Sequence, residues 1–314
     1  MENAEEEIIP PVTNPTIIPT KTYNLSNQSD IYSLVKEADG EELKKQLSLH
    51  LEKLIHDYGL SSYRVVFLYD DYFSIGTYHS NKIYEAIADV NKTADILMIL
   101  LSDGGRIEPA YLISKTCHRL ANKKFVVSVP RRAKSAATLI SLGASEIHMG
   151  FLSELGPIDP QIGGFPALGL ANALEKIAAL STKFPDSADM FAKYLTANLN
   201  IKDLGLFERI NESATQYAER LLGGKAFPKP RTAQSLADHF TNHYKDHSFV
   251  IDVDEASRLL GDGMVKEGTK EYELGNSVYK FLEFVDLMLS VFKDKTLRYV
   301  GSVKDGMDLN DKKN

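Results

Sequence analysis

Ser135 is the residue of this sequence best suited to act as a nucleophile. It lies in the run AKSAAT (133–138), which follows a predicted strand and begins a predicted helix. The small neighbours let a substrate approach closely, and the helix N-terminus offers N–H groups and a positive dipole end to a developing oxyanion. A serine hydroxyl needs a base to take its proton, and that base works best when a carboxylate fixes its tautomer. Taken alone, a serine at this place is more often a helix N-cap.

Gly104 and Gly105 could supply backbone N–H groups to the same chemistry. They follow Asp103 directly after a predicted buried strand and precede a predicted helix, which is where α/β proteins place their sites. Because they carry no side chain, their N–H groups can come close to a ligand. An isolated pair of glycines is more often a plain strand-to-helix turn. The lack of a Walker or G-x-G-x-x-G pattern disfavours a phosphate-binding loop.

Asp159 is a candidate carboxylate in the segment GPIDP (156–160). The glycine and prolines predict a rigid turn after a strand, which would hold the carboxylate in a fixed direction. Structural turns use the same residue types, so both roles stay open at this point.

Three segments occur in order and at compatible spacing, namely LSDGG (101–105), AKSAATLISLGASEIHMG (133–150) and SELGPIDPQI (153–162). Together they resemble the serine dehydrogenase proteinase family, which comprises relatives of Clp peptidases and of signal peptide peptidase A. The resemblance covers residues 62–164 and continues more weakly through DHSFVIDVDEASRLLGDGMV (246–265). Such a three-part match is far more specific than any of its parts.

The resemblance implies the stacked β-β-α turns of Clp and crotonase enzymes, with additional helices on the C-terminal side. It also implies a peptidase triad in the order serine, aspartate, histidine, together with an oxyanion hole of backbone N–H groups. Among the histidines we choose the one that begins the element containing Asp-Glu-Ala. The residues implied are Ser135, Asp159 and His247 for the triad, and Gly104, Gly105 and Ala136 for the oxyanion hole.

Other residues are alternatives for the base. His243 and His239 are close rivals in the sequence, whereas His148 lies in a short predicted strand and is expected to pack in the core. Relatives of signal peptide peptidase A use a Ser–Lys pair, so Lys134 and Lys193 are also weighed. Lys134 adjoins the serine, but consecutive residues at a strand-to-helix junction normally point apart. Lys193 lies at the sequence distance expected for such a lysine, although an exposed helix position is the simpler interpretation.

Strands and helices that alternate along the chain must position these residues. Strand-like runs at 63–69, 94–101 and 124–129 alternate with helix-like runs at 80–90 and 109–121. This alternation is typical of a parallel α/β sheet. Further helices are predicted at 31–58 with a break at Gly40, 135–142, 167–222, 232–244, 255–260 and 279–292, and a short strand at 146–149.

The sequence predicts one main domain with flanking segments. Residues 1–22 combine acidic residues with four prolines, which favours a disordered arm, and residues 23–60 form a helical N-terminal segment. The catalytic core is predicted over 61–165. A mainly helical extension over 166–300 would complete the active site and make oligomer contacts, and 301–314 would form a polar tail.

Composition excludes several classes of function. The net charge of -7, from 36 Lys plus Arg and 43 Asp plus Glu, gives no general attraction to nucleic acid or anionic lipid. The single cysteine, Cys117, excludes an internal disulfide and a cysteine-based metal site, and fits a reducing cytoplasm. The N-terminus lacks the basic start and apolar run of a secretory signal. The longest apolar run, 96–101, is far shorter than the roughly 20 residues that span a bilayer.

These observations predict a cytoplasmic serine endopeptidase that cleaves flexible or unfolded polypeptide through an acyl-enzyme on Ser135, without a metal or other cofactor. A homo-oligomer is expected, with the helices at 167–222 and 279–292 as candidate contacts. No AAA-type ATPase module is visible, so ATP-driven unfolding would need a separate regulatory partner. The alternatives are a Ser–Lys peptidase, an inactive Clp-fold scaffold or regulatory subunit, and a crotonase-like enzyme that acts on a thioester.

Overall fold

A seven-stranded sheet forms the centre of the computed structural model, which describes residues 23–88, 93–162, 165–198 and 201–312. The strand order is β11-β10-β1-β2-β3-β5-β9, with β1, β2, β3, β5 and β9 parallel, and β10 and β11 added beside β1 by antiparallel pairing. The predicted α/β class is confirmed, whereas the arm predicted over 1–22 lies outside the described residues. The strands are Tyr63–Tyr69 (β1), Asp95–Leu101 (β2), Phe125–Ser128 (β3), Glu146–His148 (β5), Val265–Lys266 (β9), Lys295–Ser302 (β10) and Met307–Asp311 (β11).

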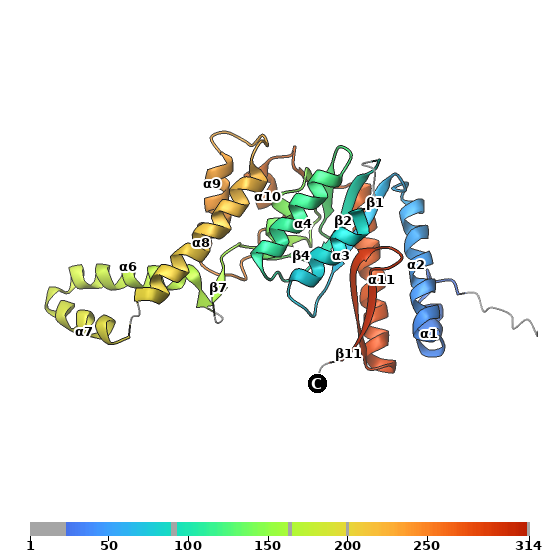
Figure 1. Cartoon of the computed structure of the whole chain (residues 1–314), viewed down its shortest axis with the longest axis horizontal. Helices are drawn as coiled ribbons and strands as arrows, with labels where there is room; N and C mark the ends of the chain where they lie inside the picture. The colour runs from blue at the N-terminus through green and yellow to red at the C-terminus, as the bar shows by residue number, and fades with distance from the viewer. Residues whose placement is uncertain (1–22, 89–92, 163–164, 199–200, 313–314) are drawn as a thin grey trace, which may run out of the picture.

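Each face of the sheet packs against its own group of helices (Figure 1). The side chains of β1 divide between the two faces, because successive residues of a strand point to opposite sides. Val66 shares a buried cluster with Ile83 of α3, and Phe67 shares the other with Val278 of α11. Because both faces of the sheet are buried, the sequences of β1 and β2 are nearly continuous apolar runs. The helices are Thr77–Ala88 (α3), Ile107–Leu120 (α4) and Ala136–Leu142 (α5) on one face, and Gln28–Glu37 (α1), Gly40–Asp57 (α2) and Lys270–Phe292 (α11) on the other.

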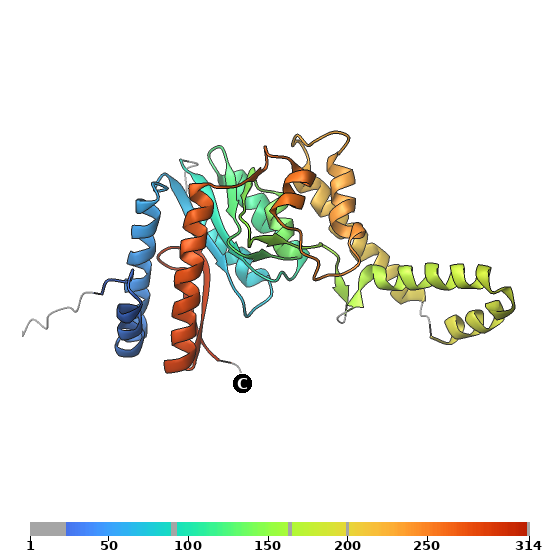
Figure 2. The same cartoon turned by 180° about the vertical axis from the view of Figure 1, so that it is seen from behind.

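Additional helices lie on the side of the sheet where α4 and α5 pack. α8 contacts α4, α5 and α9, while α6 and α7 extend away from the body as an arm, which both views show (Figures 1 and 2). These helices are Ala167–Lys183 (α6), Ala188–Asn198 (α7), Ile201–Leu222 (α8), Ala233–Asp238 (α9) and Val253–Leu260 (α10), with short turns at Pro185–Ser187 (η1) and His239–His243 (η2).

Short strands outside the main sheet connect the segments that carry the candidate site residues. β4 (Arg132–Ala133) pairs in parallel with β6 (Glu154–Leu155). A bridge joins β4 to the end of β2, and a second bridge joins β6 to Ile251. β7 (Gln161–Ile162) and β8 (Phe165–Pro166) form a separate pair. Three distant parts of the sequence are thereby aligned next to α5.

The C-terminal region differs from the prediction. The sequence predicts a polar tail at 301–314, yet Met307–Asp311 forms β11 at the edge of the sheet. Only Met307 of these five residues is buried, and a polar edge strand is a common way to prevent pairing with another chain. α11 also begins at Lys270 rather than near Tyr279, because its first turns alternate polar residues with core residues such as Leu274.

Candidate active site

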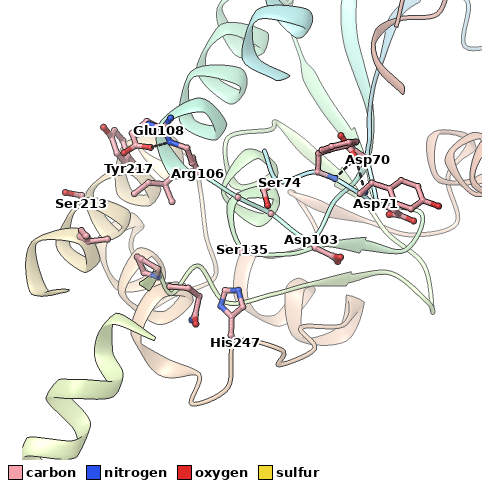
Figure 3. Close-up of a pocket in the computed structure, with 18 residues that line it drawn as sticks. Asp70, Asp71, Ser74, Asp103, Arg106, Glu108, Ser135, Ser213, Tyr217 and His247 are labelled. Atoms are coloured by element: carbon pink, nitrogen blue, oxygen red, sulfur yellow. Dashed lines mark hydrogen bonds and ion pairs between the residues drawn. The ribbon is translucent and has the colours of Figure 1, made fainter. Parts of the chain in front are cut away.

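An open cavity of about 800 Å³ lies beyond the carboxyl ends of β1 and β2 (Figure 3). Loops converge at this edge of a parallel sheet, so it is the expected place for a site in an α/β protein. The glycines after β2 line the cavity, and Ser135 and His247 reach it from two other segments. The rest of the lining comes from Asp70, Asp71, Tyr72, Phe73, Ser74, Asp103, Arg106, Ile107, Glu108, Pro160, Gln161, Ile210, Ser213 and Tyr217.

Ser135 has an unusual backbone conformation at the N-terminal end of α5. Its φ of 52° and ψ of -115° lie outside the regions that residues with a side chain usually occupy. Within the described part of the chain, its side chain makes no helix-capping hydrogen bond, so the common N-cap role is not the one seen. Ser135 is half-buried and instead lines the cavity.

The backbone N–H groups around Ser135 differ in whether they are already used. Gly104 lies so close to the serine that an added Cβ would be 2.7 Å from Ser135 Cβ, but its N–H donates to Ser102 Oγ at 3.1 Å. The N–H groups of Gly105 and Ala136 donate to no backbone acceptor among the described residues. The geometry thus differs from the prediction for Gly104, because two of the three predicted N–H groups, not all three, are available to a ligand.

Asp159 and His247 are hydrogen-bonded to each other although 88 positions separate them in the chain. His247 Nδ1 donates to Asp159 Oδ1 at 2.5 Å, and the other carboxylate oxygen accepts from Gln161 Nε2 at 2.9 Å. Asp159 is buried, whereas a third of the His247 side chain is exposed. The imidazole lies at the cavity that Ser135 also lines (Figure 3). Gln161 was not predicted as a site residue, although it is the second residue after Asp159.

The hydrogen bond with Asp159 raises the pKa of His247 above its ordinary value of 6.5. Burial acts in the opposite direction, as does the positive charge of Lys134, while the negative charges of Asp159 and Asp246 raise the pKa further. The imidazole therefore binds a proton more readily than an isolated histidine does, which favours its role as the group that takes a proton from a nucleophile.

The two candidate lysines are engaged in other contacts. Lys134 Nζ lies 2.8 Å from Glu154 Oε2, and only 13% of its side chain is exposed. Lys193 lies on the arm helix α7, where its ammonium bonds Asp189 one turn away and 78% of the side chain is exposed. Neither lysine lines the cavity.

The other candidate histidines also lie outside the cavity lining. His239 and His243 stack on each other in η2, with ring centroids 4.1 Å apart. His148 is buried in β5, as predicted for a packing residue, and its Nδ1 bonds Thr269 Oγ1 at 2.7 Å. Among the predicted histidines, only His247 contacts Asp159 in the described structure.

Arg132 joins two loops at the cavity, which the sequence did not predict. Its guanidinium bonds Asp103 Oδ1 at 2.6 Å and Asp71 Oδ1 at 3.0 Å. Asp103 precedes the two glycines, Asp71 follows β1, and Arg132 begins β4. The only signal in the sequence is that all three residues lie just beyond strands or at their ends, where side chains from different segments meet.

A buried pair, Asp70 and His79, shapes the loop next to the glycines. His79 Nδ1 accepts from the Gly76 N–H at 3.1 Å, so the proton is on Nε2, which bonds Asp70 Oδ2 at 3.0 Å. In the same loop, the Ile75 N–H donates to Gly104 O at 2.8 Å. The pair therefore fixes a loop that in turn fixes the backbone beside Ser135.

The described residues also bear on metal binding and on membrane insertion. They contain no group of three or more His, Cys, Asp or Glu side chains arranged to hold a metal ion. They also include no helix of the length and apolar character needed to cross a bilayer. Cys117 is fully buried, and burial raises the pKa of its thiol, which therefore stays protonated in the core.

Residues 66–286 match the family model described as ClpP-like SDH-type serine proteinase. An uncharacterized protein of Methanocaldococcus jannaschii is 28% identical over 211 residues, which span 67% of this chain and 65% of that relative. A second uncharacterized protein of the same organism is 28% identical over 125 residues, 40% of this chain and 39% of the relative. The chain thus spans less than two thirds of the length of either relative.

Two solved structures of one protein are also similar. They are variants of the 1510-N membrane-bound stomatin-specific protease, one with a serine-to-alanine change and one with a lysine-to-alanine change in complex with a substrate peptide. Both are 16% identical with a TM-score of 0.42 and cover 80% of this chain. The match covers 94% of the first neighbour and 89% of the second.

Proposed function

We propose that this chain, which belongs to the ClpP-like SDH-type serine proteinase family, is a serine endopeptidase whose catalytic triad is Ser135, Asp159 and His247. The hydrogen bond between His247 Nδ1 and Asp159 Oδ1, at the cavity that Ser135 lines, is the observation that carries this proposal. It supplies both the base and the carboxylate that a serine nucleophile needs. The proposed substrate is a flexible or unfolded polypeptide segment, because an open cavity with bare glycine backbone suits an extended chain.

The proposed reaction begins with attack of Ser135 Oγ on the carbonyl carbon of the peptide bond. His247 Nε2 takes the hydroxyl proton, and Asp159 holds the imidazolium that forms. The N–H groups of Gly105 and Ala136 bind the negative oxygen of the tetrahedral intermediate. His247 then gives its proton to the leaving amine, which departs and leaves an acyl-enzyme on Ser135. Water, deprotonated by the same imidazole, releases the acyl group and restores the hydroxyl.

The proposal extends to the setting of the enzyme. We expect a homo-oligomer in which the arm of α6 and α7 contributes contacts, and a separate regulatory partner where folded substrates must be opened. The proposed location is the cytoplasm, because one buried cysteine, Cys117, suits a reducing compartment.

The Ser135→Ala variant tests the nucleophile. It should lose cleavage of casein or of a peptide library down to background, and a fluorophosphonate probe should label the unaltered protein but not the variant. Ser26→Ala is the matched control, because Ser26 is exposed and far in the sequence from the residues that line the cavity. This variant should retain both cleavage and labelling. Cleavage by Ser135→Ala at the rate of the unaltered protein would refute the nucleophile. A folded protein that neither cleaves nor labels would favour the inactive scaffold.

The His247→Ala variant separates the triad from a Ser–Lys pair. The triad requires its activity to fall to the level of Ser135→Ala, because the two residues act as one unit. A Ser–Lys peptidase would keep substantial activity in His247→Ala and lose it on substitution of Lys134 or Lys193.

A further inference from the structure

Lys134 immediately precedes Ser135, and its ammonium group contacts the segments that carry the other two triad residues. Nζ lies 2.8 Å from Glu154 Oε2, donates to Phe249 O at 3.2 Å and makes a longer bond to Leu155 O at 3.4 Å. An ammonium has three N–H groups, so these three acceptors use all of them.

The acceptors belong to two segments that are also joined by a short bridge and by the hydrogen bond between His247 and Asp159. Glu154 and Leu155 form β6, which leads into the turn that carries Asp159. Phe249 is the second residue after His247. Two backbone hydrogen bonds between Leu155 and Ile251, of 2.9 and 3.1 Å, form the bridge between these segments.

The rest of Lys134 packs into the same structure. A Cβ added to Gly156 would lie 2.7 Å from Lys134 Cδ, so the glycine makes room for the lysine stem. The Lys134 N–H donates to Ser102 O at 3.0 Å, which ties the residue to the strand end before the glycines. Its carbonyl accepts from the Ala137 N–H at 2.8 Å, inside the first turn of α5.

We propose that Lys134 is a positioning residue, which fastens the segment around His247 to β6 and so sets the imidazole at a fixed place relative to Ser135. This inference rests on the triad proposed above. A general base needs a free lone pair, whereas the Lys134 ammonium donates to three acceptors and has a carboxylate beside it. The bonds thus explain why the lysine next to the serine is not the base, and they assign it a different task.

The charge of Lys134 gives this role an electrostatic signature. The charged groups that act on His247 are Asp159 in the turn after β6, Asp246 in its own segment and Lys134 between β4 and α5. The two aspartates raise the pKa of His247 and Lys134 lowers it. Glu154 lies beside Lys134, so its negative charge offsets part of the effect that the Lys134 ammonium has on the imidazole.

Two substitutions should therefore move the acidic limb of the profile of kcat/KM against pH in opposite directions. Lys134→Met keeps the length of the stem and removes a positive charge, so the pKa of His247 should rise and the limb should move to higher pH. Glu154→Gln leaves the ammonium without its carboxylate, so the limb should move to lower pH. A purely structural role would not produce opposite shifts.

The same variants should lower kcat more than they weaken substrate binding. Without the Lys134 bonds, the His247 segment is held by the Leu155–Ile251 bridge and by the hydrogen bond to Asp159. We therefore expect kcat of Lys134→Met to fall by about 10- to 100-fold with little change in KM. Lys134→Arg keeps the charge and the donors and should recover much of kcat. Lys115→Met, at an exposed lysine on α4, is the matched control and should behave as the unaltered protein. Circular dichroism melting curves identify any variant that does not fold. If Lys134→Met does not fold, Glu154→Gln provides the test instead.

The outcomes separate this inference from the proposed function. If Ser135→Ala and His247→Ala are inactive while Lys134→Met keeps the kcat and pH profile of the unaltered protein, the positioning role is wrong and the triad stands. Acidic limbs that shift in the same direction in Lys134→Met and Glu154→Gln would also overturn it. If His247→Ala stays active while Lys134→Met and Lys134→Arg are both dead, Lys134 is the base, and both proposals fail.

Discussion

The strained backbone of Ser135 is the residue-scale feature that most sets this position apart. For a residue with a side chain, a backbone conformation of φ 52° and ψ -115° costs about 1–3 kcal/mol of folding free energy. Such a conformation persists only when the surrounding structure determines it. Those surroundings are visible, since Lys134 is bonded to Ser102 O on one side and the Leu139 N–H donates to Ser135 O on the other. In this conformation Ser135 makes no capping hydrogen bond among the described residues and lines the cavity.

The pKa of His247 predicts how activity depends on pH. The base must be neutral to accept a proton, so kcat/KM should fall as pH drops through the raised pKa. Asp159→Asn removes the largest cause of that increase, so the acidic limb should move to lower pH. The same change should reduce kcat on the order of 10³–10⁴-fold, because the amide no longer fixes the tautomer. Initial rates across the pH range check both effects. An acidic limb at an unchanged pH would show that another group controls it.

Gly105 is a residue whose missing side chain matters. Its φ is +149°, and an added Cβ would lie 2.3 Å from Ile75 N, which is backbone and cannot move aside. Gly105→Ala should destabilise the protein by at least about 1–3 kcal/mol and lower kcat, because the displaced loop carries a proposed oxyanion donor. Gly40→Ala is the control, since nothing lies within 4 Å of its added Cβ. Urea unfolding and peptide cleavage measure the two effects, and an unaltered kcat in Gly105→Ala would argue against the donor.

At the scale of elements, the loop between β1 and α3 depends on the buried contact of His79 with Asp70. His79→Leu should destabilise the protein by about 2–4 kcal/mol, because it leaves the Asp70 carboxylate buried without its partner. It should also lower kcat, since Ile75 in this loop is bonded to Gly104. Asp70→Asn, which keeps an acceptor for His79, should cost less in both measurements. Equal stability of His79→Leu and the unaltered protein in urea would contradict the importance of the contact.

The sequence predicted the elements whose patterns are strong and local. The apolar runs of β1 and β2 are long enough to identify the parallel sheet, and the motifs around Ser135 and Asp159 led to a histidine that the structure does join to Asp159. Their catalytic roles stay predictions. The hydrogen bond from the Gly104 N–H to Ser102 Oγ could not be predicted, because it depends on loop dihedral angles that glycine leaves free.

Interactions between distant segments also could not be predicted from the sequence. The direction of the Lys134 side chain is set by acceptors about 20 and 115 positions away, which no local pattern reveals. The edge strand β11 was missed because its exposed residues are polar, as expected for a strand with one unpaired side. Local patterns thus fixed the element types, while tertiary contacts decided which groups meet at the cavity.

At the scale of the whole molecule, α6 and α7 project from the body as an arm, which both views show (Figures 1 and 2). Where their side chains are described, no residue of these two helices is buried. Large apolar side chains at its end are exposed, with Phe184 at 50% and Met190 at 59%. An exposed apolar surface of this kind is typical of a protein–protein contact.

A second copy of this chain is the partner we expect for the arm, because most soluble oligomers are symmetric homo-oligomers. Sedimentation velocity should therefore show an oligomer, and a Phe184→Ser/Met190→Ser double variant should shift toward the monomer, since each change removes apolar area from the contact. Leu112→Ser, at a residue of similar exposure on α4, is the control and should leave the assembly unchanged. The fold should survive in all variants, because these side chains are at least half exposed. A monomer for the unaltered protein would exclude the arm as a self-association surface, whereas loss of assembly in the double variant together with lower peptidase activity would tie catalysis to the oligomer.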